Sequence, residues 1–424
     1  MIIYKLFESW RTIAVALCCM LWQTAVSQTY NTITVNLEND VVSKYFDEVT
    51  YTREDTSVIA KYDAIPPSPH YIPRPVKIVL PETIRDTVAT LLFADNDHLD
   101  QPMRRTSEKG DQEINIYNLV PQRVYCYKLL VGDSLVSEGE IHTEGQLRMI
   151  YVPGLRNVRD LGGWRTEDGS TIKYGKIIRG TELNNVYSCD SASIEMMKDE
   201  LGIAAELDMR ANYNQNNNIS AFDFLSAAKV EGSEVPSYYY TSDSGQLPEH
   251  LTRSSFLYKW KQSFNFIVNN LKEDRTIYMH CVHGANRTGY MALLLEGLLG
   301  VEYDQLVKDY ELTYFSNKHE TKEIADLVID YIDGLDGETL KDKFRTFFIS
   351  KVKVSAGNID YFINEMLEHN ILTGIESAGG GGASACPNVV YNAEGMILPS
   401  KSGKGMLIER RPDGTVRKRF DVSR

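Results

Sequence analysis

A cysteine and an arginine stand at the two ends of one short loop in this chain, within the run His-Cys-Val-His-Gly-Ala-Asn-Arg-Thr-Gly-Tyr at 280–290. The β-prone run at 275–279 precedes the loop, and residues rich in helix formers follow it at 291–300. The loop is therefore predicted to join a strand to a helix. Because the free amides and positive dipole of a helix N-terminus attract anions and stabilise a thiolate, the pattern predicts a phosphate-binding loop.

Cys281 and Arg287 have the chemistry needed to attack and hold a phosphoryl group. A free cysteine has a pKa of about 8.5, and helix N-termini or nearby cations lower it to roughly 3.5 to 7.5. The planar guanidinium of Arg287 could bind two equatorial phosphate oxygens, and Thr288 could hydrogen-bond the thiolate or assist hydrolysis of the thiophosphate. Substrate binding is expected from Thr288 and from the other loop residues, Val282, His283, Gly284, Ala285 and Asn286.

Two histidines in the loop raise the question of a metal site. A zinc site would need further cysteine or histidine ligands at a recognisable spacing, and none follows. We therefore expect His280 to orient the loop and His283 to form part of the pocket wall. No metal and no cofactor is expected.

The loop resembles the signature of the cysteine-dependent protein tyrosine phosphatase superfamily, His-Cys-x-x-Gly-x-x-Arg-Thr-Gly. The run Asn-Val-Arg-Asp-Leu-Gly-Gly-Trp-Arg-Thr at 157–166, with Gly-Lys-Ile-Ile-Arg-Gly at 175–180, resembles the N-terminal signature of the bacterial tyrosine phosphatase family, whose members often also hydrolyse phosphoinositides. Segments 202–210 and 309–313 are similar to later parts of that family, in the expected order. The resemblance implies an α/β fold, a tyrosine-phosphatase-like sheet flanked by helices.

The loop departs from the family pattern at Ala285 and Asn286, where the family usually has Lys-Asp. An asparagine cannot donate a proton as an acid does. Poor leaving groups need a proton on the departing oxygen, whereas phenolic leaving groups need less help. The departure therefore favours aryl phosphates and moves the proton donor to another residue.

Asp208 is the first choice for the proton donor, because it ends a strand-like run whose carboxyl end should face the same crevice as the loop. The alternative is a structural role for Asp208, either capping the next segment or pairing with Arg210. Asp243, in a polar segment upstream of the nucleophile, is the second candidate acid. Arg159 and Arg179 could bind anions or form buried salt bridges.

Residues 1–27 predict a secretory signal peptide. Lys5 and Arg11 precede an apolar core at 13–22, and Ala25-Val26-Ser27 offers a small-residue cleavage site. The protein is expected to be exported to the periplasm, the cell surface or the extracellular space, with an uncleaved anchor as the alternative. An oxidising compartment would threaten Cys281, because accessible thiolates of low pKa are the ones oxidised.

The length and the shifts of composition predict several domains. Short alternating strands predict an N-terminal β-sandwich that resembles a fibronectin type III or immunoglobulin-like module, and a small C-terminal β module is similar to those of secreted proteins from the Bacteroides group. The predicted parts are a signal peptide at 1–27, an N-terminal extension at 28–72, the β-sandwich at 73–146, the catalytic domain at 150–373, a glycine-rich linker at 376–386 and the β module at 387–424. Helices are expected in the catalytic domain at 191–201, 255–270, 288–299, 303–313, 321–334 and 340–349.

The formal net charge of −13 excludes nucleic acid as a natural partner. We expect an exported cysteine-dependent phosphatase that hydrolyses phosphotyrosine or other phosphomonoesters, on a protein or a small molecule, through a cysteinyl-phosphate intermediate. The alternatives are a phosphatase of phosphoinositides or inositol phosphates, and a pseudophosphatase that binds phosphorylated ligands without turnover. The oligomeric state is left open.

Overall fold

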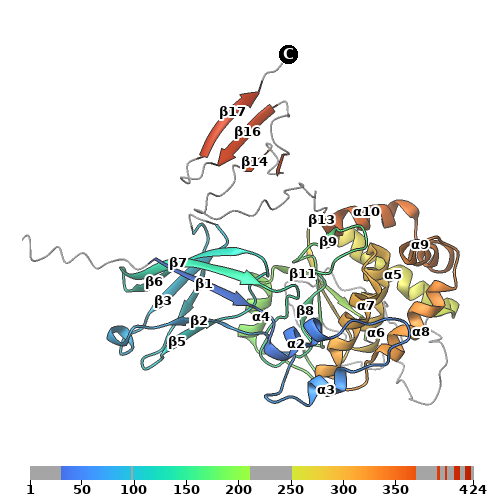
Figure 1. Ribbon diagram of the computed structural model, residues 1–424, viewed down its shortest axis with the longest axis horizontal. Coiled ribbons are helices and arrows are strands. Elements are labelled where there is room, and N and C mark those ends of the chain that lie inside the picture. The colour runs from blue at the N-terminus through green and yellow to red at the C-terminus, as the bar shows by residue number, and fades with distance from the viewer. Residues whose placement is uncertain are drawn as a thin grey trace, which may run out of the picture. The chain divides into compact units, whose positions relative to one another are not determined.

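The computed structural model describes residues 30–96, 99–210 and 251–368, together with four strands farther along the chain. The chain divides into two compact units, residues 1–369 and 370–424. The first is a mixed α/β structure with several sheets (Figure 1). The predicted signal peptide, the glycine-rich linker and Asp243 lie outside the described residues. Within the described ranges, every helix is too short or too polar to cross a membrane.

Two sheets enclose one apolar core in the N-terminal part of the first unit. The larger has the order β1 (Tyr30–Asn36), β7 (Ser134–Glu144), β6 (Val124–Val131), β3 (Thr90–Ala94) and β4 (Met103–Thr106). The smaller pairs β2 (Val76–Val79) with β5 (Glu113–Ile116), and a 3-10 turn, η1 (Glu82–Ile84), follows β2. Alternate residues of β6 point inward, namely Tyr125, Tyr127 and Leu129, as the period of two requires. The likeness to a fibronectin type III module remains a prediction.

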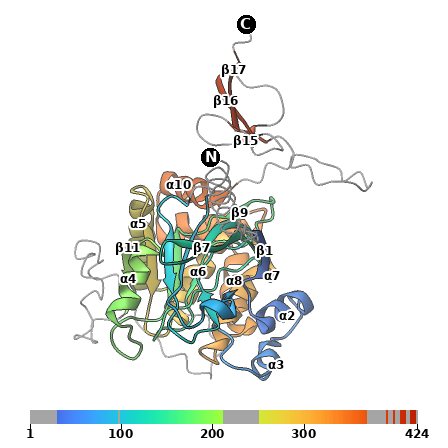
Figure 2. The ribbon, with the colours of Figure 1, turned by 90° about the vertical axis from the view of Figure 1, so that its left-hand side faces the viewer.

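The predicted N-terminal extension is built into both parts of the first unit. Its strand β1 pairs in parallel with β7. Its helices α2 (Asp40–Glu48) and α3 (Ile59–Asp63) lie beside α7 (Tyr303–Leu312) and α8 (Lys322–Asp333) of the predicted catalytic domain (Figure 2). The Asn39 side chain caps α2 by accepting from the amides of Val41 and Val42.

Glu311, buried on α7, joins this extension to the predicted catalytic domain. Its Oε2 accepts hydrogen bonds from the hydroxyls of Tyr45 at 2.7 Å and Tyr51 at 2.6 Å. Its Oε1 accepts from the Ser57 hydroxyl and from the amide of Lys322, the latter at 2.8 Å. Three of these four donors therefore come from the N-terminal extension.

The predicted catalytic domain is built on a third sheet, of order β11 (Ile203–Asp208), β12 (Thr276–His280), β10 (Ile177–Gly180) and β8 (Arg159–Asp160). The first three strands are parallel, and β8 is antiparallel to β10. One face packs on α5 (Ser254–Leu271) and α6 (Asn286–Leu299), and the other packs near α4 (Ser191–Asp199). The register sets Gly180, Asp208 and His280 in one row at the carboxyl ends of the strands.

Helix α6 is the centre of the region. It is buried on all sides, which suits an apolar helix enclosed by other helices. Gly297 lets α9 (Leu340–Thr346) approach closely, because a Cβ at position 297 would lie 2.3 Å from the ring of Phe344 on α9. The surrounding elements are α7, η5 (Thr313–Phe315), α8 (Lys322–Asp333), α9 (Leu340–Thr346), the π-helical η6 (Phe347–Val352) and α10 (Ala356–Met366). A small pair of strands, β9 (Thr171–Ile172) and β13 (Leu367–Glu368), lies at its margin.

The second unit contains one antiparallel sheet of order β15 (Ile397–Leu398), β14 (Val389–Tyr391), β16 (Gly405–Arg410) and β17 (Val416–Asp421). The sequence pattern predicts three strands in this region. The structure adds β15, a strand of two residues, which is too short to give an alternating pattern.

We expect Glu311→Ala to lower the free energy of unfolding by about 2 to 4 kcal/mol, because buried hydroxyl and amide donors would lose their acceptor. Urea unfolding measures the change. Asp330→Ala, which removes an exposed carboxylate paired with Arg53, is the control and should cost less than about 1 kcal/mol. Equal stability of the wild type and Glu311→Ala would contradict the proposed anchoring of the extension.

Candidate active site

The loop with the cysteine and the arginine lies where the sequence predicts, between a strand and a helix. Strand β12 ends at His280, and α6 begins at Asn286. Gly284 has φ +64°, and a Cβ there would lie 2.4 Å from the carbonyl oxygen of Gly180. Only glycine fits this conformation and this contact.

A buried ionic cluster holds the loop from behind. Arg179, fully buried, donates to Asp309 at 2.6 Å and to the carbonyl oxygen of Gly284 at 3.1 Å. Arg159 also donates to Asp309, at 2.8 Å, and Asn157 donates to the Gly284 carbonyl at 3.0 Å. Of the two roles open to Arg159 and Arg179, the structure places both in buried salt bridges.

The thiol of Cys281 is buried, with 3% of the residue exposed. Burial alone would raise its pKa. The charge of Arg287, the neighbouring hydroxyl and amide of Thr288, and the charge of His280 together outweigh burial, so the pKa of the thiol lies below its usual value. A lowered pKa favours the thiolate, which is the nucleophilic form.

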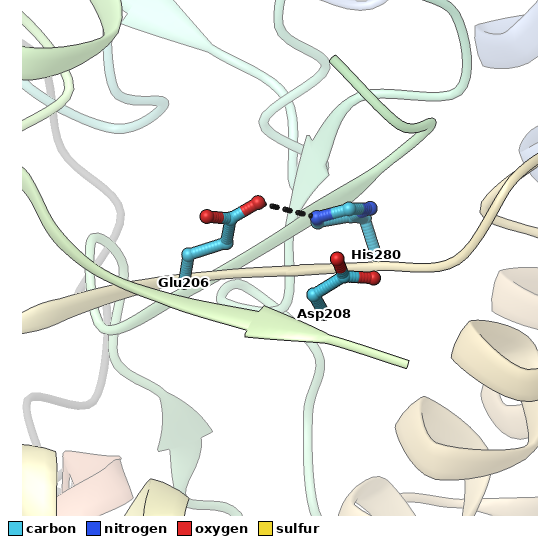
Figure 3. A group of neighbouring side chains, drawn as sticks. All are labelled: Glu206, Asp208 and His280. Carbon is cyan, nitrogen blue, oxygen red and sulfur yellow. Dashed lines mark hydrogen bonds and ion pairs between the residues drawn. The ribbon is translucent and has the colours of Figure 1, made fainter. Parts of the chain in front are cut away.

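His280 supplies part of that positive charge. Its Nε2 lies 2.8 Å from a carboxylate oxygen of Glu206 (Figure 3). Its Nδ1 lies 3.0 Å from the carbonyl oxygen of Cys281. Both partners only accept hydrogen bonds, so both ring nitrogens must carry a proton for both bonds to form. Burial lowers the pKa of His280. The charge of Asp208 and the hydrogen bond and charge of Glu206 raise this pKa by more than burial lowers it, so it lies above its usual value.

Asp208 lies in the same row, but its surroundings disfavour the predicted role of proton donor. Its two carboxylate oxygens accept from the guanidinium of Arg210 at 2.9 Å and 2.7 Å, and Oδ1 also accepts from the Arg210 amide. Burial would raise the pKa of Asp208, but His280 and Arg210 lower it to about 2. A carboxyl with that pKa is ionised at neutral pH, so the structural alternative, pairing with Arg210, describes it better.

Arg287 follows the loop at the first turn of α6 and is 6% exposed. One nitrogen of its guanidinium donates to the carbonyl oxygen of Met209 at 2.7 Å. The guanidinium is thereby brought to the carboxyl end of β11, beside the thiol whose pKa it lowers.

The remaining loop residues form its wall and its helical start. His283 contacts the Tyr187 hydroxyl at 3.2 Å, and burial lowers the pKa of His283, so it is neutral at pH 7. The carbonyl oxygen of Val282 accepts from the amide of Glu182. Ala285 is buried and directly precedes α6, whose first residue is Asn286.

Glu206, Asp208 and His280 lie close enough to hold a metal ion, with one ligand atom from each within 4.8 Å of the others. The carboxylate of Asp208 is already bound by Arg210, and Glu206 is bound to the His280 ring (Figure 3). A cation would have to displace these bonds. We therefore infer that Glu206, Asp208 and His280 set the charge around the loop and do not bind a metal ion.

Comparison with known proteins identifies the phosphatase region. The tyrosine phosphatase family matches residues 150–369 of the 424 in the chain. The chain belongs to this family.

A curated relative from Cupriavidus necator, named as a tyrosine-protein phosphatase, is 25% identical over 166 residues, which are 37% of this chain. The chain spans 59% of the length of that relative.

Two solved structures are similar to part of the chain. The core catalytic domain of the PP-IP phosphatase Siw14 from S. cerevisiae, in complex with citrate, has 15% identity and a TM-score of 0.25, with 39% of this chain and 86% of that chain covered. P. aeruginosa TpbA has 14% identity and a TM-score of 0.27, with 42% and 90% covered. At these TM-scores the likeness adds nothing to the family assignment.

Sequence reasoning missed two buried carboxyl groups, Glu206 and Glu320. Glu206 lies one inward-facing position before Asp208 on β11, so the alternation of a strand could have placed it near His280. Glu320 lies after η5 and carries no motif, but the thiolate of Cys281 contributes to raising its pKa.

We expect Asp208→Asn to lower the free energy of unfolding by about 2 kcal/mol at neutral pH, because the carboxylate has a pKa of about 2 in the folded chain against a usual 3.8. A carboxyl whose pKa is lower in the folded than in the unfolded chain stabilises the fold at pH values above its unfolded pKa. The difference in free energy of unfolding between Asp208→Asn and the wild type should therefore vanish as the pH falls from about 4 to about 2. Denaturant unfolding across this pH range measures it.

Leaving-group dependence separates this role from acid catalysis. If Asp208 has only a structural role, Asp208→Asn should change the turnover of aryl phosphates and of alkyl phosphates by the same factor. A loss confined to alkyl phosphates would restore Asp208 as the proton donor.

Proposed function

We propose that this chain is a cysteine-dependent phosphatase that hydrolyses phosphotyrosine or other phosphomonoesters. The observation that carries the proposal is the buried thiol of Cys281, whose pKa is lowered at the N-terminal end of α6 beside Arg287. The thiolate attacks phosphorus, Arg287 neutralises charge on the equatorial oxygens, and a cysteinyl-phosphate forms that water then hydrolyses.

The substrate class is part of the proposal. The missing Lys-Asp pair at Ala285 and Asn286 favours phenolic leaving groups over inositol or serine. Initial rates on a phosphotyrosine peptide, a phosphoinositide and an inositol polyphosphate test this preference. Faster turnover of either inositol compound would move the assignment to that class, and tight binding with no turnover of any of them would support the pseudophosphatase alternative.

Export is a separate proposal that rests on the leader-like residues 1–27. Fractionation of cells that produce the full chain should place the phosphatase in the periplasm, at the surface or in the medium. Recovery in the cytoplasm with an intact N-terminus would contradict it.

Cys281→Ser should lower kcat on para-nitrophenyl phosphate by at least roughly a thousandfold, because the nucleophile is lost. Cys189→Ser is the matched control. Burial and Asp190 raise the pKa of Cys189 to about 11, so this thiol stays protonated and its loss should leave turnover unchanged. A similar loss in both variants, or none in Cys281→Ser, would contradict the assignment of the nucleophile.

Hydrogen peroxide should inactivate the enzyme, and a thiol reductant should restore it as long as oxidation stops at the sulfenic acid. The thiolate is the reactive form, so inactivation should be faster at pH values above the lowered pKa of Cys281 than below it. Mass analysis should locate the modification on Cys281 and not on Cys189. Activity that is indifferent to peroxide would argue against a thiolate mechanism.

A further inference from the structure

Arg156 is an exposed arginine whose backbone is fixed beside the loop that carries Cys281. Its amide donates to the Thr181 hydroxyl at 3.2 Å, and its carbonyl oxygen accepts from the Thr181 amide at 3.3 Å. Thr181 directly follows β10, and the next amide, that of Glu182, donates to the carbonyl oxygen of Val282 in the loop at 3.0 Å. Arg156 therefore lies at the carboxyl end of the sheet, where the loop begins.

The guanidinium of Arg156 lies near two aromatic rings. Its central carbon is 5.7 Å from the ring centre of Tyr71 and 5.9 Å from that of Tyr187. A guanidinium within about 6 Å of a ring centre is attracted to the ring face. Both tyrosines are partly buried, whereas Arg156 is exposed. The two rings thus hold the positive charge in one place and leave it open to solvent.

Tyr187 connects this charge to the loop. Its ring packs edge to face against the His283 ring, with centres 5.6 Å apart and planes at 89°. Its hydroxyl lies 3.2 Å from Nδ1 of His283, which is the second residue after Cys281. Arg156, Tyr187 and His283 therefore form a continuous row of side chains that ends on the loop.

Tyr71 belongs to the N-terminal extension, which holds its backbone on both sides. The Asn39 side chain donates to the carbonyl oxygen of His70 at 2.7 Å and to that of Ile72 at 2.9 Å. His70 is buried, and its ring packs edge to face on Phe315 of η5 with centres 5.4 Å apart. The extension thereby supplies one of the two rings beside Arg156 from a fixed position.

Arg156 differs from the buried arginines of the same domain in its charge balance. Arg148, Arg159, Arg179 and Arg210 each form an ion pair with a carboxylate. Among the described residues, no carboxylate forms an ion pair with Arg156. An exposed guanidinium that has ring contacts but no counter-ion can bind an anion through its planar fork.

We propose that Arg156, held between Tyr71 and Tyr187, binds an acidic side chain next to the phosphotyrosine of a protein substrate. This inference rests on the proposed function, in which the phosphate itself is bound by the loop and Arg287. A phosphotyrosine substrate carries a second anion beside its phosphate when an aspartate or glutamate flanks it, and the charge of Arg156 is complementary to that anion. Arg156 is then a specificity-determining residue that takes no part in bond breaking.

The test compares two phosphotyrosine peptides that differ only in the flanking residues, glutamates in one and glutamines in the other. We expect the wild type to have the higher kcat/KM for the glutamate peptide, mainly through a lower KM, because the ion pair is present before and during the reaction. Arg156→Gln should lower the ratio of the two kcat/KM values roughly threefold to tenfold. Added salt should lower the wild-type ratio as well, because the ion pair is exposed.

Three companion variants define the role of the charge and of the rings. Arg156→Lys keeps the charge and should retain part of the preference. Tyr71→Leu keeps the arginine but removes one ring, so the ratio should fall by a smaller factor than in Arg156→Gln. Arg165→Gln is the matched control. Arg165 is also exposed, but it follows β8, which runs away from the carboxyl end of β10, so its loss should leave the ratio unchanged.

Equal kcat/KM of the wild type for the two peptides, or the wild-type ratio in Arg156→Gln, would overturn the role of Arg156 while leaving Cys281 as the nucleophile. A loss in Arg156→Gln that is seen with an inositol polyphosphate and not with the peptides would assign the second anion to a phosphate and would also overturn the proposal. Failure of the wild type to hydrolyse either peptide or para-nitrophenyl phosphate in reductant would instead contradict the proposed function itself.

Discussion

The ionic bonds that Arg159 and Arg179 make with Asp309 are the constraint on which the site depends. Buried guanidinium groups are tolerated only when they are paired, and here the pairing also fixes the loop, because Arg179 donates to the Gly284 carbonyl as well as to Asp309. The carbonyl is drawn toward β10, and Gly284 lies directly on the Gly180 backbone. The loop is therefore shaped before substrate arrives, which is the condition for electrostatic catalysis.

The site separates its carboxyl groups by environment. Asp208 is held ionised by His280 and Arg210, whereas burial and the thiolate keep Glu320 protonated. Glu206 binds the His280 ring and so helps to keep positive charge next to the sulfur. A chain with a net charge of −13 thus keeps a positive field at Cys281.

The sequence predicts those parts of the molecule that contiguous residues determine. The strand, loop and helix around Cys281 are of this kind, as are the helices α4 to α9, because each lies in a continuous run of helix-forming residues. The helices α2, α3 and α10 are absent from the sequence-based prediction, although α2 and α10 each bury one apolar face. The sequence offers both proton donation and pairing with Arg210 as roles for Asp208, and only the folded positions of Arg210 and His280 decide between them. Nothing in the local sequence of Glu320 marks this residue as buried.

The extension at 28–72 also makes contacts with residues far along the chain that the sequence does not predict. A polar stretch before a proline-rich segment predicts an N-terminal extension, and the structure adds that Tyr45 and Tyr51 donate hydrogen bonds to a carboxylate on α7, far along the chain. Such a contact is visible only in three dimensions.

The central claim is that the Cys281 sulfur forms a covalent bond to phosphorus during turnover. Rapid acid quenching during hydrolysis of an aryl phosphate, followed by mass spectrometry of the proteolysed chain, tests it most directly. The account predicts a peptide that carries one phosphoryl group on Cys281 and that is absent from Cys281→Ser. A phosphoryl group on another residue, or steady turnover with no phosphorylated peptide under conditions that preserve thiophosphates, would contradict it.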